Sequence, residues 1–551
     1  MKNLRFLLII IIHLLSNNEA QDMKKAFING YIFTCDKNNS THEAVIVENN
    51  KIIFVGSNQQ AKEKIDNNTL VIDLNGKLLL PGFIDNHVHF INGGLYLLGI
   101  DLRPANSTKE FKEILKQYAE TNRGKWITGG YWDHEKWETK SYPTKEMIDE
   151  VVPDQPVFVS RLDGHMGVAN SLALKLAGIT KDTPNPDGGI IVKDPVTGEP
   201  TGLLKDSAMD YIFNIIPSPT DEEYYQALDA ALQEAKRLGV TSVQDISFND
   251  ALRAYQKAKD EGILTCRIYT RLPIAEYKSL VEKGIKAGFG DEYIKLGSLK
   301  AFADGSLGSS TAWFFEKYSH DTTTYGLPMD IVLDGSLEKW ALDADKNGLQ
   351  LSIHAIGDKA NSYILDLFEK ITNENPKWDR RFRIEHAQHV KFEDIKRFKD
   401  LGVIASAQPY HCIDDGVWAE KRIGVERIKY TYPFKSFLDN DVHLCFGTDW
   451  YVAPLNPLLG IYAAVTRRTL DDKNPDGWVP EQKISVQEAI RCYTINSAYA
   501  AFEENIKGSI EVGKLADMVV LSENILLIDP VRIKDVEVVM TIFDGNIIYQ
   551  K

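Results

Sequence analysis

Short apolar runs alternate with amphipathic, helix-like stretches through most of the chain. A first run leads through Pro81-Gly82 and ends at His87–His89, and seven more of strand character follow at residues 240–246, 266–270, 296–302, 349–354, 382–386, 403–408 and 442–449. Helix-like segments lie between them, for example at 222–238, 249–261, 337–347, 359–373 and 392–401. Strands that alternate with helices form parallel sheets, and eight such units close into a barrel. The pattern therefore predicts an α/β fold with a (β/α)8, TIM-like barrel.

Two parts of the chain depart from this alternation. Residues 23–75 and 508–551 both have the texture of short strands and turns, which predicts one small β-sandwich domain built from both termini. Two separate β extensions are the alternative. Roughly 140 residues separate the first barrel strand from the second, far more than a normal crossover. We expect residues 104–220 to form a subdomain inserted after the first strand, as a lid within a barrel domain of residues 76–507.

The first 20 residues have the pattern of a secretory signal peptide. Lys2 and Arg5 precede an apolar run at residues 6–15, and the small residue Ala20 ends the polar stretch that follows. The apolar run is too short for a comfortable membrane span, although an uncleaved N-terminal anchor is the alternative. We therefore expect an exported protein, periplasmic or secreted, with no membrane contact beyond this segment.

Composition and charge narrow the class of protein further. The 551 residues exceed the length at which one core stops growing, and 44% hydrophobic with 26% charged residues is typical of globular proteins. A net charge of −15 argues against a nucleic-acid partner, which needs a basic surface. Five cysteines follow neither a zinc nor a disulfide spacing. A small-molecule substrate is the expected partner, and a homodimer is compatible with this composition.

Metal-ligating side chains fall at the predicted strand ends, where the chemistry of such barrels is located. His87 and His89 are two residues apart, so in a strand both point to the same face. His354, His386 and Asp449 end the fifth, sixth and eighth predicted strands. Neutral imidazoles with a carboxylate suit zinc or a similar divalent ion. For the first pair alone, one buried and one solvated histidine is the plainer alternative.

Lys300 is a lysine in the apolar surroundings of the fourth predicted strand, shortly before Asp304. Because a nearby cation would repel its ammonium group, the residues alone favour a salt bridge to Asp304 or a side chain that reaches solvent. The other interpretation is that CO2 has added to the amine and formed a carbamate that bridges two metal ions.

These stretches together resemble the amidohydrolase superfamily, and specifically the family-3 branch that includes N-substituted formamide deformylase-like metal-dependent hydrolases. The matching stretches are Pro81 to His89, Lys300 to Gly308, His354 to Asp358, Arg383 to Gln388, Gln408-Pro409, Gly447 to Asp449 with Pro454 to Pro457, and Gly513 to Asp517. The resemblance covers essentially the whole mature chain.

The resemblance implies a centre for one or two divalent metal ions, with zinc expected and Lys300 carboxylated. The implied ligands are His87, His89, Lys300, His354, His386 and Asp449. Asp449 would act as general base toward a metal-activated hydroxide and then return the proton to the leaving amine.

Two further histidines resemble substrate-binding positions of this branch. His165, in the inserted region, would contact the substrate carbonyl or its tetrahedral intermediate as a catalytic residue. A histidine that caps a helix or holds the lid is the alternative. His411, in a Gln-Pro-x-His stretch after the seventh strand, would line the substrate pocket, and a surface histidine is the alternative.

Aromatic residues in the insertion and in loops after strands suggest a substrate with an aromatic or apolar group, although loop tryptophans more often only pack their loop. They are Trp132, Trp137, Trp313, Trp418, Trp450 and Tyr451. Trp450 and Tyr451 directly follow Asp449, where related chains often carry smaller residues, and both are predicted to bind substrate.

The leading hypothesis is a metal-dependent hydrolase of a non-peptide C–N bond in an amide, formamide or cyclic amide. A second hypothesis keeps the site but changes the reaction to hydrolysis of an ester or to deamination. A third is a non-catalytic exported binding protein on the same barrel. A serine hydrolase is disfavoured because the chain lacks a Gly-x-Ser-x-Gly stretch.

Overall fold

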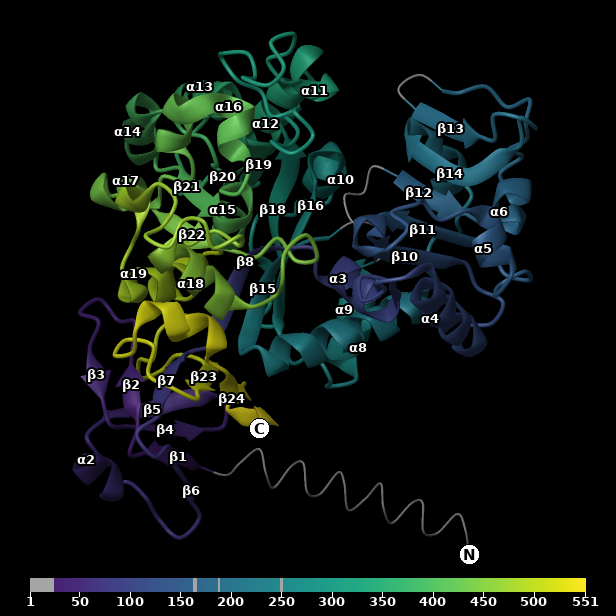
Figure 1. Cartoon of the computed structure of the whole chain (residues 1–551). Helices are drawn as coiled ribbons and strands as arrows, with labels where there is room; N and C mark the ends of the chain where they lie inside the picture. The colour runs from purple at the N-terminus through teal and green to yellow at the C-terminus, as the bar shows by residue number, and fades with distance from the viewer. Residues whose placement is uncertain (1–23, 162–165, 187–188, 248–250) are drawn as a thin grey trace, which may run out of the picture. The chain divides into compact units, whose positions relative to one another are not determined.

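The computed structural model of the chain describes residues 24–161, 166–186, 189–247 and 251–551 (Figure 1). It divides into two compact units, one of Met1–Phe90 with Ala231–Lys551 and one of Ile91–Ala230. The predicted signal peptide at residues 1–20 lies outside the described residues. Within the described ranges, no helix has both the length and the apolar character that a membrane crossing requires.

The first unit is built on a nearly closed barrel of eight parallel strands, which confirms the predicted fold class. In barrel order the strands are β8 (Phe83–Val88), β15 (Val240–Ile246), β16 (Arg267–Pro273), β18 (Ile294–Phe302), β19 (Leu351–Ala355), β20 (Arg383–His386), β21 (Ile404–Ala407) and β22 (Leu444–Phe446). A short strand, β17 (Phe289–Gly290), pairs antiparallel with β18. Beyond the end of β22, the Asp449 backbone N donates to His87 O at 2.7 Å and joins the last strand to the first.

The barrel strands are buried on both faces, as parallel strands covered by helices must be. All residues of β15, β19, β20, β21 and β22 are buried. The outer layer (Figure 1) contains helices α9 (Ala251–Asp260), α10 (Tyr277–Glu282), α11 (Asp330–Leu333), α12 (Ser336–Lys346), α13 (Asp358–Glu374), α14 (Phe392–Leu401), α15 (Pro409–Asp415), α16 (Ala419–Arg427), α17 (Phe434–Asp439), α18 (Pro457–Thr466), α19 (Val486–Cys492) and α20 (Ile495–Ala500).

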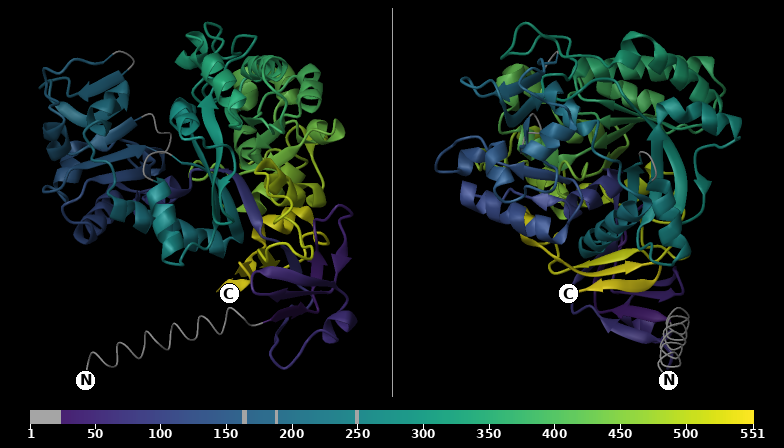
Figure 2. Two further views of the ribbon diagram at one scale, coloured as in Figure 1. Left: turned by 180° about the vertical axis from the view of Figure 1, so that it is seen from behind. Right: turned by 90° about the vertical axis from the view of Figure 1, so that its right-hand side faces the viewer.

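Both ends of the chain contribute to two further sheets of the same unit, as predicted. One sheet contains β1 (Lys25–Ile28), β4 (Ala44–Glu48), β5 (Lys51–Gly56) and β6 (Leu70–Asp73), with α2 (Asn58–Lys62) beside it. The other contains β2 (Tyr31–Phe33), β3 (Thr41–His42), β7 (Leu78–Pro81), β23 (Met518–Leu521), β24 (Val538–Phe543) and β25 (Asn546–Gln550). The pairing of β7 with β23 joins the N-terminal and C-terminal strands, which lie side by side in Figure 2. One apolar core, with Phe27, Val45, Leu79 and Met518, fills the space between the sheets.

The second unit, Ile91–Ala230, has a six-stranded mixed sheet of its own. Its strands are β9 (Ile100–Asp101), β10 (Ile127–Trp132), β11 (Val157–Arg161), β12 (Met166–Ala169), β13 (Gly189–Lys193) and β14 (Pro200–Asp206). Its helices are α4 (Thr108–Thr121), α5 (Lys145–Asp149), α6 (Ser171–Leu176) and α7 (Asp210–Phe213), and α3 (Phe90–Leu98) and α8 (Asp221–Arg237) contain the unit boundaries. The exact domain limits and the role of this unit as a lid stay predictions.

Two tryptophans of the inserted unit turn out to be core residues. Trp132 and Trp137 are fully buried, and their indole N–H groups donate to the carbonyls of Val159 at 2.8 Å and Ala105 at 3.1 Å. Both pack in one apolar cluster with Phe111. For these two residues, packing of their own unit explains the aromatic side chain.

Candidate metal centre

The end of β8 carries His87 and His89, and a buried aspartate fixes its position. Asp85 accepts hydrogen bonds from the backbone N of His87 at 3.1 Å, the backbone N of Thr448 at 3.0 Å and the Thr448 hydroxyl at 2.5 Å. In addition, the His89 backbone N donates to Trp450 O at 2.8 Å. These hydrogen bonds hold the first barrel strand, β8, against the segment that follows the last barrel strand, β22. Asp449 lies in this segment.

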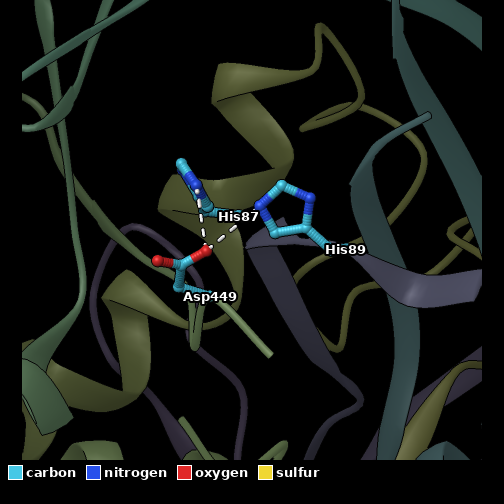
Figure 3. Close-up of side chains that lie close together, drawn as sticks. All are labelled: His87, His89 and Asp449. Carbon is cyan, nitrogen blue, oxygen red and sulfur yellow. Dashed lines mark ion pairs between the residues drawn. The ribbon is translucent and has the colours of Figure 1, made fainter. Parts of the chain in front are cut away.

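His87, His89 and Asp449 form a compact group of metal-ligating atoms (Figure 3). The Nε2 atoms of His87 and His89 lie 3.5 and 3.4 Å from the same oxygen, Oδ1 of Asp449. One ligand atom from each residue lies within 4.8 Å of the other two, a spacing that one ion can bridge. Asp449 has a positive φ of 58°, a conformation uncommon for a non-glycine residue that is often found at functional sites.

His354 and His386 lie beside this group, from the ends of β19 and β20. Their ring centroids are 4.5 Å apart, and that of His386 is 4.8 Å from the ring of His87. His354 Nε2 is 2.9 Å from the carbonyl oxygen of Gly305 and 3.5 Å from Asp304 Oδ1. The four predicted histidines are thus neighbours, but among the described residues the compact three-ligand cluster contains only the first two and Asp449.

Lys300, on β18, is buried with its ammonium group toward these histidines. Burial lowers the pKa of Lys300 to about 8, although the charges of Glu385 and Asp449 act to raise it. Its Nζ has no hydrogen-bond partner among the described residues. The salt bridge to Asp304 is not formed there; that carboxylate instead accepts backbone hydrogen bonds from Trp313, Ile356 and Gly357. Nζ lies 4.7 Å from the centre of the Phe302 ring, but a buried amine without a hydrogen bond is costly.

Glu385 is a residue of the site to which the sequence assigned no role. Its Oε2 contacts His87 Nδ1 and accepts from Ser406 Oγ at 2.6 Å, while its Oε1 pairs with Arg271 Nη1 at 2.6 Å. Because a carboxylate only accepts, the proton of His87 resides on Nδ1, and Nε2 keeps its lone pair for a ligand. Arg271 also donates to the Asn86 carbonyl oxygen at 2.6 Å. The signal available in the sequence was the presence of charged residues inside two predicted barrel strands, β16 and β20.

The electrostatics of the centre fit a divalent cation. Burial, with the nearby charge of Lys300, lowers the pKa of His354 to about 3 and also lowers the pKa of His87. Burial likewise holds the pKa of His386 well below its usual value. These imidazoles are therefore neutral near pH 7, as metal binding requires. Neutral imidazoles and one carboxylate form a donor set that suits zinc and similar ions.

The predicted substrate-binding residues have different surroundings. His411 Nε2 is 3.3 Å from the second oxygen of Asp449, Oδ2. Trp450 is buried with its ring 6.0 Å from that of Phe90, whereas Tyr451 is 38% exposed with its ring 6.2 Å from that of His89. His165 lies outside the described residues. The roles of these residues in substrate binding stay predictions.

A parallel barrel with histidines and a carboxylate at the carboxyl ends of its strands is the arrangement expected of a metal-dependent hydrolase. Residues 70–549 match the model of the family described as "Amidohydrolase family", and the chain belongs to that family, as its motifs predicted. The hydrolase and metal-binding class is thereby established, while the substrate is not.

The chain is similar along most of its length to other members. It is 40% identical over 513 residues to Protein LONG AFTER FAR-RED 3 of Arabidopsis thaliana, which covers 90% of this chain and 86% of that protein. It is 26% identical to an N-substituted formamide deformylase of Arthrobacter pascens, over 95% of this chain and 98% of the relative. The crystal structure of an uncharacterized metal-dependent hydrolase from Pyrococcus horikoshii OT3 matches with a TM-score of 0.78 at 31% identity, over 92% of this chain and 99% of the other.

Proposed function

We propose that the protein hydrolyses a non-peptide C–N bond in an amide, formamide or cyclic amide. The observation that carries the proposal is the convergence of His87, His89 and Asp449 on one point, with a second pair of histidines beside them. The similarity to an N-substituted formamide deformylase supports an amide as the substrate. Export, a small-molecule substrate and a homodimer stay predictions from the sequence.

The residues of the centre fit one or two divalent ions, with zinc as our proposal. His87, His89 and Asp449 would hold the first ion, and His354 and His386 would hold the second. Lys300, carboxylated by CO2, would supply oxygen ligands between them. When bound, such ions supply a Lewis acid for the carbonyl and lower the pKa of water toward neutrality.

Asp449 is the residue placed to move the proton. Burial acts to raise the pKa of its carboxyl group, but the interaction with His87 and the hydrogen bond from His411 more than offset this and hold the pKa well below its usual value. The carboxylate is therefore ionised at neutral pH and can accept a proton from the attacking water. It then donates that proton to the amine nitrogen as the C–N bond breaks, so that the leaving group departs neutral.

We expect Asp449→Asn to lower kcat by about 100- to 10,000-fold, the usual effect of removing a general acid–base. The amide keeps the shape of the side chain but cannot take up a proton. The measurement is steady-state kinetics together with the metal content of the same sample. Asp439→Asn is a matched control, because Asp439 pairs with Lys435 on the solvent-facing side of α17 and should change neither quantity. An Asp449→Asn enzyme with full metal content and unchanged kcat would contradict this role.

The proposed function is tested with metal-reconstituted protein and a panel of N-formyl, N-acetyl and cyclic amides. We expect turnover of at least one amide, its loss with a chelator and its return with Zn²⁺. Matched esters and aminopurines in the same panel test the two alternative reactions. If only these are hydrolysed or deaminated, the amide proposal is wrong. If nothing turns over although metal binds, a non-catalytic binding role takes its place.

A further inference from the structure

Arg422, on α16, has a guanidinium group of which only one nitrogen is engaged. Its Nη1 donates to Ser310 Oγ at 2.6 Å and to His320 Nε2 at 3.0 Å. Among the described residues these are its only side-chain hydrogen bonds, and no carboxylate pairs with it there. The Nε–H and both Nη2–H donors are therefore unused, although Arg422 is half-buried.

Other arginines of the barrel unit use this same edge on carboxylates. Arg267 donates through Nε and Nη2 to both oxygens of Asp517, at 2.6 and 3.0 Å. Arg380 does the same to Asp345, at 2.8 and 3.1 Å. The two parallel N–H groups of this edge match the spacing of carboxylate oxygens and form strong bidentate pairs. In Arg422 this edge is left open for a ligand from outside the chain.

The surroundings hold the guanidinium in place without neutralising it. Ser310 has a positive φ of 60°, a strained conformation for serine that aims its hydroxyl at Arg422. The Trp418 ring centroid lies 5.6 Å from the guanidinium carbon. The Arg422 carbonyl accepts from the backbone N of Ser319 at 2.8 Å, which joins α16 to the loop that carries Ser310. A fixed cation with an open edge loses little entropy when it binds an anion.

Arg422 and its partner Ser310 lie on two segments of the chain, and both segments start next to the metal centre. The loop that carries Ser310 follows β18, and its Gly305 carbonyl lies 2.9 Å from His354 Nε2. Thr311, next to Ser310, returns to Gly305 through a backbone hydrogen bond of 3.3 Å. α16 follows α15, whose His411 faces Asp449. Arg422 on α16 and Ser310 in the loop after β18 therefore both belong to segments that follow barrel strands at their carboxyl ends, the side on which such barrels bind substrate.

We propose that Arg422, with Ser310 and His320 fixing its position, binds a carboxylate of the substrate. The substrate class would then be amides that carry a negative charge, such as N-acyl amino acids. This inference rests on the proposed amide hydrolysis and specifies its substrate. One guanidinium edge offers the pair of donors that one carboxylate accepts, which is why we assign a carboxylate.

The test compares two substrates that differ only in the presence of the carboxylate group, N-acetylphenylalanine and N-acetylphenethylamine, with the metal-reconstituted protein. We expect kcat/KM for the carboxylate substrate to be about 10- to 100-fold higher, the size of a charged hydrogen-bonded pair. In Arg422→Gln this ratio should fall to near one. Arg532→Gln is the matched control, because Arg532 pairs with Glu523 at the surface and should leave the ratio unchanged. A wild-type ratio near one, or a ratio that survives Arg422→Gln, would overturn the inference.

A binding measurement separates this inference from the proposed function. Calorimetric titration with hippurate, and with its uncharged carboxamide, needs no turnover. We expect hippurate to bind about 10-fold more tightly or better than the carboxamide, and Arg422→Gln to abolish the difference. If hippurate binds in this way but no amide is hydrolysed, the proposed function fails and the carboxylate site stands. If hippurate and the carboxamide bind equally, the carboxylate site is wrong whatever the enzyme hydrolyses.

Discussion

Lys300→Ala is expected to lose most of its bound metal and almost all activity. Burial lowers the pKa of Lys300 to about 8. About one amine in ten is then neutral at pH 7, against about one in 3,000 at the ordinary lysine value. CO2 adds only to the neutral amine, with loss of one proton, and the product is a carboxylate on Nζ. Alanine removes the ligand itself. We therefore expect metal affinity to fall by more than the roughly 10- to 100-fold that is typical when a residue supporting a ligand is replaced.

Four measurements check this expectation. Metal content should fall together with rate, and the carbamate signal that ¹³C-bicarbonate gives in the wild-type protein should be absent. Metal uptake by wild-type protein in bicarbonate should be faster at pH 8 than at pH 7, because more of the amine is neutral. Propionate, which can occupy the vacated space with a carboxylate, should partly restore activity to Lys300→Ala.

The folding control follows from the geometry of the amine. Because Lys300 Nζ makes no hydrogen bond with the described residues, metal-free Lys300→Ala should still unfold cooperatively, losing no more than a large-to-small core substitution typically costs, about 2–5 kcal/mol. A variant with normal metal content and normal rate would show that the carbamate assignment is wrong. Loss of metal from a protein that still folds would place the defect at the centre itself.

The barrel could be predicted because short runs of strand character alternate regularly with helix-like segments along the chain. The runs at 240–246 and 382–386 became β15 (Val240–Ile246) and β20 (Arg383–His386), and the helix expected at 392–401 is α14 (Phe392–Leu401). The histidines were visible for a related reason, since a polar side chain that ends an apolar run needs a partner. The prediction of the barrel therefore depended on the alternation of strands and helices, and the prediction of the site depended on polar residues at strand ends.

The supporting carboxylates could not be predicted in the same way. Strand alternation places Glu385 and His386 on opposite faces, yet both face the centre, because His386 has a positive φ of 71° that breaks the alternation. The partner of Glu385 is Arg271 on β16, a strand separated from β20 by β18 and β19 in the barrel. That pairing depends on the tilt and register of the strands across the barrel interior, which the local sequence does not specify.

Glu385→Gln is expected to lower metal affinity by about 10- to 100-fold, as the loss of a carboxylate that orients a ligating histidine does. The amide no longer fixes the proton of His87 on Nδ1, so Nε2 is no longer held as a free lone pair. The same change leaves the Arg271 charge buried and unpaired, which should cost about 3–5 kcal/mol of stability. Competition with a chromophoric chelator measures the first effect, and thermal unfolding of the metal-free protein measures the second.

The double variant Arg271→Met with Glu385→Met separates these two effects. It removes the buried ion pair as a whole, and apolar side chains of similar volume at such a pair are often neutral or stabilising. We therefore expect thermal stability to return most of the way to the wild-type value. Metal affinity should stay low, because His87 Nδ1 still lacks its acceptor. If affinity instead returns together with stability, Glu385 serves the fold alone. If metal affinity stays low while stability returns, the Arg271–Glu385 pair positions His87 for metal binding. The buried ion pair inside the barrel is then a functional part of the metal centre.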